Sequence, residues 1–206
     1  MNTLIVNITE NKKGFEDRLA NEVLAALENE YPNRNTLVNI TNSNFDELEQ
    51  EISKNDVIFL VGHGLADDDI DLIELFPTDT ASTGGSFDHF RIFNNYELLA
   101  HFIGIQNHRF LLILCVCDGF CPSSLSITMD FPNLIGVIGS KTKVLIPNHQ
   151  QALISLLKRF HQQWITDSRA SKHVESVTMQ WKKEFSEVKD FHFFPGFTII
   201  DDGFEE

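Results

Sequence analysis

The stretch FLLILCVCDG, residues 110–119, holds the most apolar run of the chain and ends in a thiol followed by turn residues. A continuous apolar run closed in this way is typical of a strand buried on both faces of a parallel sheet. An earlier stretch, DVIFLVGHG at 56–64, has the same layout, with a histidine between two glycines. The two stretches predict buried strands whose ends carry reactive side chains beside glycine.

Further strand and helix patterns alternate on both sides of these two stretches. Short apolar segments predict strands at 3–8, 36–40, 70–76, 134–138 and 197–200. Helical periodicity predicts helices at 15–31, from residue 44, at 95–103, at 148–165 and at 171–188. This alternation is typical of an α/β fold with a mostly parallel central sheet. No repeat or linker interrupts it, so we expect a single domain over residues 1–206.

The net charge and the cysteine content limit which partners and which cellular location we expect for the protein. Sixteen basic and thirty acidic side chains leave a formal net charge of −14. Such a charge repels phosphate backbones and anionic lipids, so we expect neither nucleic acid nor membrane as a partner. The first residues lack the basic start and long apolar stretch of a signal peptide. The three cysteines crowd into residues 115–121 and form no disulfide framework, so we expect a cytoplasmic protein with reduced thiols.

The ends of the two strands predict a catalytic pair. The carboxyl ends of neighbouring parallel strands meet at one edge of a sheet, where α/β proteins place their functional groups. There His63 can accept the thiol proton of Cys117 and create a nucleophilic thiolate. A glycine such as Gly64 leaves backbone N–H groups open to stabilise an oxyanion. We therefore expect chemistry from His63 and Cys117, which are 54 residues apart.

Two cysteines compete for the role of nucleophile. Cys115 and Cys117 are two residues apart, so strand alternation points both side chains the same way. Cys117 stands at the strand end, directly before the Asp118-Gly119 turn, where backbone N–H groups become accessible. Cys115 is one pleat deeper, and we expect it to line the wall of the cleft. We therefore assign the nucleophile to Cys117.

With these motifs in this order, the sequence resembles the caspase-like cysteine peptidases, and most of all the CHAT branch found in many bacteria. That branch has a strand ending in His-Gly, as at His63-Gly64, and a later strand ending in Leu-Ser-Ala-Cys with a nearby glycine, as in the layout of 114–119. The stretch 131–140 is similar to the strand that follows in the family, and the likeness extends over nearly the whole chain. The resemblance implies a three-layer sandwich, a His63–Cys117 dyad, and an oxyanion hole formed by the backbone N–H groups of Gly64 and Cys117.

The sequence departs from the family pattern near the expected substrate site. Cys115-Val116 replaces the usual Ser-Ala before the nucleophile, and Lys141 stands where a bulky aromatic residue is common. By their positions we expect Cys115, Asp118, Ser140 and Lys141 to contact substrate. Caspase-like enzymes that cut after basic residues often carry an acidic residue two positions before the nucleophile, where this chain has Cys115. The resemblance therefore implies an uncharged or apolar residue at P1, the position before the scissile bond.

These features together predict a cysteine endopeptidase that acts in a bacterial regulatory or defence setting through a thiol acyl-enzyme. The alternative is a catalytically silent protein of the caspase fold that binds or scaffolds another protein. We also expect an activating or regulatory protein partner, or self-association, to control the enzyme through the irregular stretch 65–94 beside the cleft.

Metal sites are the remaining alternatives. The three cysteines with His63 or His108 could be combined into a zinc site, but Cys-x-Cys on a strand presents its sulfurs poorly for one tetrahedron. The acidic run at 67–74 could bind calcium, although the EF-hand pattern is missing and a solvated loop explains the charges. No glycine-rich phosphate loop supports a nucleotide enzyme. We therefore expect no metal and no other cofactor.

Overall fold

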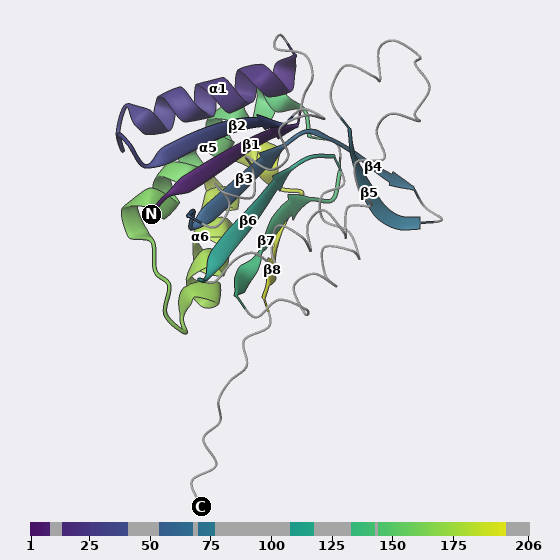
Figure 1. Cartoon of the computed structure of the whole chain (residues 1–206). Coiled ribbons are helices and arrows are strands. Elements are labelled where there is room, and N and C mark those ends of the chain that lie inside the picture. The colour runs from purple at the N-terminus through teal and green to yellow at the C-terminus, as the bar shows by residue number, and fades with distance from the viewer. Residues whose placement is uncertain are drawn as a thin grey trace, which may run out of the picture.

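A six-stranded sheet forms the centre of the molecule (Figure 1). The computed structural model describes residues 1–8, 14–40, 54–67, 70–76, 108–117, 133–142 and 144–196, with 63–67 and 70–76 described through their backbone. The strand order is β2-β1-β3-β6-β7-β8, and only β8 runs antiparallel to its neighbour. The bounds are β1 Thr3–Ile8, β2 Asn35–Ile40, β3 Val57–Val61, β6 Phe110–Cys115, β7 Leu134–Ser140 and β8 Phe191–Pro195. A separate antiparallel hairpin, β4 His63–Asp67 and β5 Ile70–Phe76, follows β3 directly.

The described helices cover one face of this sheet (Figure 1). They are α1 Phe15–Glu28, α5 Ile146–Gln163, α6 Ala170–Glu184 and the short 3-10 helix η2 Ser186–Val188. Helices that follow parallel strands run back against them, so α1 and α5 both begin at the carboxyl edge of the sheet. Trp181 of α6 donates its indole N–H to the carbonyl of Ala152 in α5 at 2.7 Å, which satisfies a polar atom inside the helix layer.

Both faces of the central strands are buried. Phe59 and Ile113 belong to the core cluster beneath the helices and are fully buried. Ile58 and Leu112, which alternate with them and face the other way, are each only 2% exposed. Burial on both faces explains why these strands have continuous apolar sequences, and it confirms the predicted α/β class with a mostly parallel sheet.

Most predicted elements in the described ranges are confirmed, with boundary shifts of a few residues. The apolar residues that give 15–31 its helical periodicity include Leu19, Val23 and Leu27, which are buried on one face of α1. Phe15 has the same spacing but is 59% exposed, because it is the first residue of the helix and lies at its open end. Strand β8 was not expected. The strand predicted at 197–200 and the helices predicted from residue 44 and at 95–103 lie outside the described residues.

Candidate functional site

The central pair of strands brings the two predicted motifs to one edge of the sheet. Strands β3 and β6 are parallel neighbours, and Val61 lies opposite Cys115 in their register. One residue further, the backbone N–H of Gly62 donates to the carbonyl of Cys115 at 3.4 Å. His63 and Cys117 are each two residues beyond the Val61–Cys115 pair. Their backbones therefore leave neighbouring strands at the same height, about 5 Å apart by ordinary strand spacing.

The hairpin that follows β3 holds the backbone of the histidine. His63 is the first residue of β4 and lies opposite Phe76 of β5, while Gly64 lies opposite Leu75. Figure 1 shows the hairpin projecting from the carboxyl edge of the central sheet. The acidic run falls on this hairpin, apart from Asp68 and Asp69, which lie outside the described residues. The backbone of His63 is therefore positioned by two elements: β3, which precedes it in the chain, and the β4–β5 hairpin, which it begins.

The two cysteines have different surroundings. Cys115 is the last residue of β6, is 1% exposed and belongs to the core cluster beneath the helices. Burial, followed by the proximity of Cys117 and Glu16, raises the pKa of its thiol far above the usual range. Cys117 lies beyond the strand in a turn, is partly exposed and forms no disulfide. Of these two described thiols, only that of Cys117 is therefore accessible to a substrate.

This placement differs from the expectation that Cys115 lines the cleft. Its side chain follows the alternation of Leu111 and Ile113, which face the helix layer. Strand β6 ends at Cys115, so the alternation does not continue to Cys117. Because Cys115 packs in the core, its neutral side chain no longer supports the prediction of an uncharged P1 residue.

The other residues expected to contact substrate also differ in their exposure to solvent. Ser140 ends β7 but is 2% exposed, and its hydroxyl oxygen accepts the backbone N–H of Thr142 at 3.2 Å. This hydroxyl has a structural role in closing the strand end and is not open to a substrate. Lys141 is exposed, and its backbone N–H donates to the carbonyl of Asp190 at 3.0 Å. Asp118 lies outside the described residues.

A buried polar cluster supports the same edge from beneath α1, and the sequence analysis missed it. Asn7 is fully buried and lies opposite Asn39 of β2 on one side and Val61 of β3 on the other. Its amide nitrogen donates to Asn39 at 2.8 Å and to the carboxylate of Asp17 in α1 at 3.3 Å. The signal in the sequence is the repeated Val-Asn-Ile at the ends of the first two strands. This cluster ties the start of α1 to the ends of β1 and β2, and β1 lies beside the strand β3 that leads to His63.

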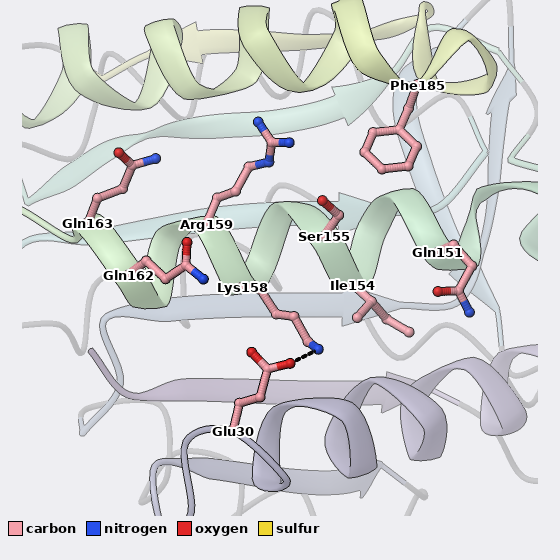
Figure 2. A pocket seen from close by; sticks show the side chains of 9 residues that line it. All are labelled: Glu30, Gln151, Ile154, Ser155, Lys158, Arg159, Gln162, Gln163 and Phe185. Carbon is pink, nitrogen blue, oxygen red and sulfur yellow. Dashed lines mark hydrogen bonds and ion pairs between the residues drawn. The ribbon is translucent and has the colours of Figure 1, made fainter.

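A pocket of about 640 Å³ lies elsewhere (Figure 2). It follows the outer surface of α5 between the end of α1 and Phe185. Most of its lining is polar, and Lys158 and Arg159 are already paired with Glu30 and Glu184. It lies on the outer side of the helix layer and is lined by neither His63 nor Cys117, so we do not connect it with the strand-end site.

Metal ligation finds no support in the described residues, which contain no group of three His, Cys, Asp or Glu side chains suited to an ion. Cys121 lies outside the described ranges, so the zinc alternative stays a prediction. None of the helices in the described part of the chain combines the length and apolar character needed to cross a bilayer.

The strand order, the parallel register and the motifs at the carboxyl edge define an α/β protein of caspase-like fold. The chain is similar to a solved secreted C11 cysteine protease from Bacteroides thetaiotaomicron, with a TM-score of 0.51 and 13% sequence identity. The match covers 90% of this chain but only 59% of the protease chain. The comparison supports the caspase-like fold and gives no support for the CHAT branch in particular.

No protein-family model matches the sequence, and no curated protein is significantly similar to it.

Proposed function

We propose that the protein is a cysteine endopeptidase that cleaves a protein substrate with a dyad of His63 and Cys117. One observation carries the proposal. The register of Val61 with Cys115 places both residues two positions beyond the ends of adjacent parallel strands. Glycine flanks the histidine on both sides, and Cys117 is the partly exposed cysteine of the described pair. The likeness to a solved cysteine protease adds support at the level of the fold.

The chemistry follows from these two groups. His63 takes the proton from the thiol of Cys117, and the thiolate sulfur attacks the peptide carbonyl carbon. The tetrahedral intermediate collapses, the C–N bond breaks, and the protonated His63 gives its proton to the leaving amine. Water, deprotonated by the same histidine, then attacks the thioester and releases the acid product with the thiol restored. No step needs a cofactor.

The negative charge on the oxyanion of the tetrahedral intermediate must be stabilised by hydrogen-bond donors that lie near the sulfur of Cys117. We assign them to the backbone N–H groups of Gly64 and Cys117, since both lie where the chain leaves the sheet. A donor of this kind typically contributes a factor of about 10² to 10³ in rate. A side chain at position 64 would crowd the approach of the peptide carbonyl, so glycine suits this position.

The competing proposal is a silent caspase-fold scaffold. It predicts a folded protein that reacts with no mechanism-based probe. The test is labelling with peptide acyloxymethyl ketones of varied P1 residue, followed by mass spectrometry of the modified peptide. Covalent labelling of Cys117 that disappears in His63→Ala supports the dyad. Absence of labelling at Cys117 with every probe would support the scaffold, and labelling of Cys115 would move the nucleophile by two residues.

The setting of the enzyme stays a prediction. Crowded reduced cysteines favour a cytoplasmic location, whereas the solved neighbour is described as secreted. Control by a regulatory partner or by self-association is likewise part of the proposal, and we assign it to the stretch 65–94, which lies between His63 and Cys117 in the sequence.

A further inference from the structure

We propose that the protein forms a symmetric dimer through β2, which pairs antiparallel with β2 of a second copy and joins the two sheets. The inference goes beyond the proposed function, because it concerns the outer edge of the sheet, two strands away from β3. It requires no peptidase activity. Its support comes from the backbone of β2, from the lack of protection along this edge, and from the symmetry of the strand's sequence.

Strand β2 is the outermost strand of the sheet and lies under α1 (Figure 1). It pairs with β1 on one side, and within the described part of the chain no strand pairs with its other side. The backbone N–H of Thr3 donates to the carbonyl of Arg34 at 2.9 Å, so the carbonyl of Arg34 points toward β1. The backbone groups of successive strand residues alternate between the two sides. Those of Leu37 therefore point toward the outer edge.

This edge lacks the features that usually protect an edge strand. Natural proteins place a charged side chain, a proline or a β-bulge there, because unpaired backbone groups attract another strand. The sequence of β2, NTLVNI, contains no charge and no proline, and its register with β1 is unbroken from Asn35 to Ile40. The opposite edge strand, β8, ends in Pro195, which has no N–H to donate. Of the two edges, β2 is therefore better suited to pair with another strand.

The sequence of β2 is symmetric in character about Leu37. An asparagine stands two residues before it and another two residues after it, and a β-branched residue stands on each side. Antiparallel pairing centred on Leu37 places Asn35 opposite Asn39 of the second copy. It also places Thr36 opposite Val38, so residues of like kind meet at every pair. A twofold interface must complement itself, and this pattern favours a second copy over an unrelated peptide as the occupant.

The backbone of β2 fits the same register. In an antiparallel pair, residues that exchange two N–H···O bonds alternate with residues that exchange none. Leu37 points its backbone groups outward and would exchange both bonds with Leu37 of the second copy, at the twofold axis. The pairing uses the backbone, so the amide of Asn35 keeps its bond to Glu28 and Asn39 keeps its bond from Asn7.

Helix α1 lies beside the proposed interface. Glu28, the last residue of α1, accepts the side-chain N–H of Asn35 at 2.9 Å, so the stripe of α1 that contains Glu28 lies over β2. Leu24 is one turn earlier on this stripe and is partly exposed. A twofold axis perpendicular to the sheet brings α1 of the second copy to the same face. A pairing of two short strands buries less than the roughly 1,000 Å² of a stable interface, so we expect a weak dimer that these helices support.

The charge of the chain opposes this dimer at long range. Each copy carries a net charge of −14, so two copies repel each other. The strand that forms the contact is itself uncharged, and salt screens the repulsion between the remaining surfaces. We therefore expect added salt to strengthen the dimer, whereas it would weaken an interface held by ion pairs.

Sedimentation velocity of the full chain, from about 1 μM to about 500 μM, measures the association. We expect a monomer–dimer equilibrium with a lower Kd at about 0.5 M salt than at about 0.05 M. Thr36→Lys puts a charge on the edge strand and should raise the Kd at least about tenfold. Gln180→Lys, at an exposed position of α6, adds the same charge and should leave the dimer intact. A chain that stays monomeric at every concentration and at both salt levels overturns the proposal.

Cysteine cross-linking tests the register and does not depend on the folding of Thr36→Lys. The Cα atoms of a non-hydrogen-bonded antiparallel pair are about 4.5 Å apart, which a disulfide can span. Thr36→Cys and Val38→Cys are made as separate proteins, each in the Cys117→Ala background. When the two are mixed and oxidised, mass spectrometry should find a disulfide between positions 36 and 38, and neither protein alone should form one at its new cysteine. A dimer that lacks this disulfide in the mixture, or that persists unchanged in folded Thr36→Lys, has its interface elsewhere and overturns the proposal.

Discussion

The backbone N–H of Gly62 donates to the carbonyl of Cys115 at 3.4 Å. This contact extends the β3–β6 ladder one residue beyond β3, up to the point where the chain turns into the hairpin. It holds the ends of two strands at one height, so His63 and Cys117 must leave the sheet side by side. The geometry of the proposed site therefore depends on backbone pairing before any side chain takes part.

The dyad gives the first prediction. Cys117→Ala and His63→Ala should each reduce kcat/KM at least about 10³-fold, since residues that act as a unit fail together. Cys115→Ala is the matched control and should stay within about threefold of the native protein. It loses a buried sulfur, so the free energy of unfolding should fall by about 1 kcal/mol. Peptide turnover and urea denaturation give the two readouts, and an inactive Cys115→Ala protein that is still folded would contradict the assignment.

The second prediction concerns the cluster beneath α1. Asn7→Ala leaves the carboxylate of Asp17 and the amide of Asn39 without this donor, so the free energy of unfolding should fall by about 1 to 3 kcal/mol. Asn21→Ala, which removes an exposed bond of 2.7 Å to the carbonyl of Asp17, is the control and should cost less. If urea denaturation gave the same decrease in the free energy of unfolding for both variants, the burial of Asn7 would add nothing to the stability that its hydrogen bonds provide.

Stability toward acid provides a third prediction. His161 stacks on Tyr31 at a centroid distance of 4.4 Å and shares a 3.0 Å hydrogen bond with Thr3. Burial, followed by the positive N-terminus and Arg34, lowers the pKa of His161 to about 4. An unfolded histidine titrates near about 6.5, so between these values the unfolded chain binds more protons. Stability should therefore fall as the pH drops from about 6.5 to about 4.

The free energy of unfolding should fall by about 1 to 2 kcal/mol over this pH range. This is less than the full pKa shift of His161 would give, because solvent reaches part of the ring. Urea denaturation at several pH values measures it. In His161→Gln this part of the pH dependence should disappear, while His173→Gln serves as the control. An unchanged pH profile in His161→Gln would show that other groups govern acid sensitivity.

A tight contact in the edge strand pair gives the fourth prediction. A Cβ atom at Gly136 would lie 2.2 Å from the carbonyl oxygen of Phe194 and 2.3 Å from the ring of Phe193. Gly136→Ala should therefore separate β7 from β8 and lower the free energy of unfolding by about 2 kcal/mol or more. Gly14→Ala, at a backbone φ of −68° that alanine adopts freely, should change it little. Similar melting temperatures for both variants would argue against the close packing of this pair.

Activation is the subject of the fifth prediction. If the proposed peptidase acts in the cytoplasm, its activity needs restraint there, and we therefore expect the isolated chain to cleave peptides weakly. Turnover per molecule should rise with protein concentration if self-association activates it, or on addition of a partner protein. Dynamic light scattering across the same concentrations reports the oligomeric state. Full turnover that is independent of concentration in the monomer would remove the need for an activator.

The local patterns of the sequence were enough to predict the central strands. Runs such as 57–61 and 110–115 are apolar at every position because both faces of a parallel sheet are covered, and this property is visible without tertiary information. The order of His63 and Cys117 at two strand ends followed from the same patterns. Strand β8 was missed because FHFFP is a half-buried edge strand that contains proline and a polar residue.

By itself, the sequence determined which strands are buried and which reactive residues follow them, because burial and turn chemistry are local properties of the chain. Tertiary structure decided which of these residues meet. The end of β6 at Cys115 separates a core thiol from the partly exposed Cys117, although strand alternation alone would point both side chains the same way. The pairing of β7 with β8 places Ser140 opposite Phe191, which is 51 residues away in the sequence. The proximity of residues that are distant in sequence depends on the register between the strands that carry them. Long-range packing sets this register, and it leaves no periodic signal in the sequence.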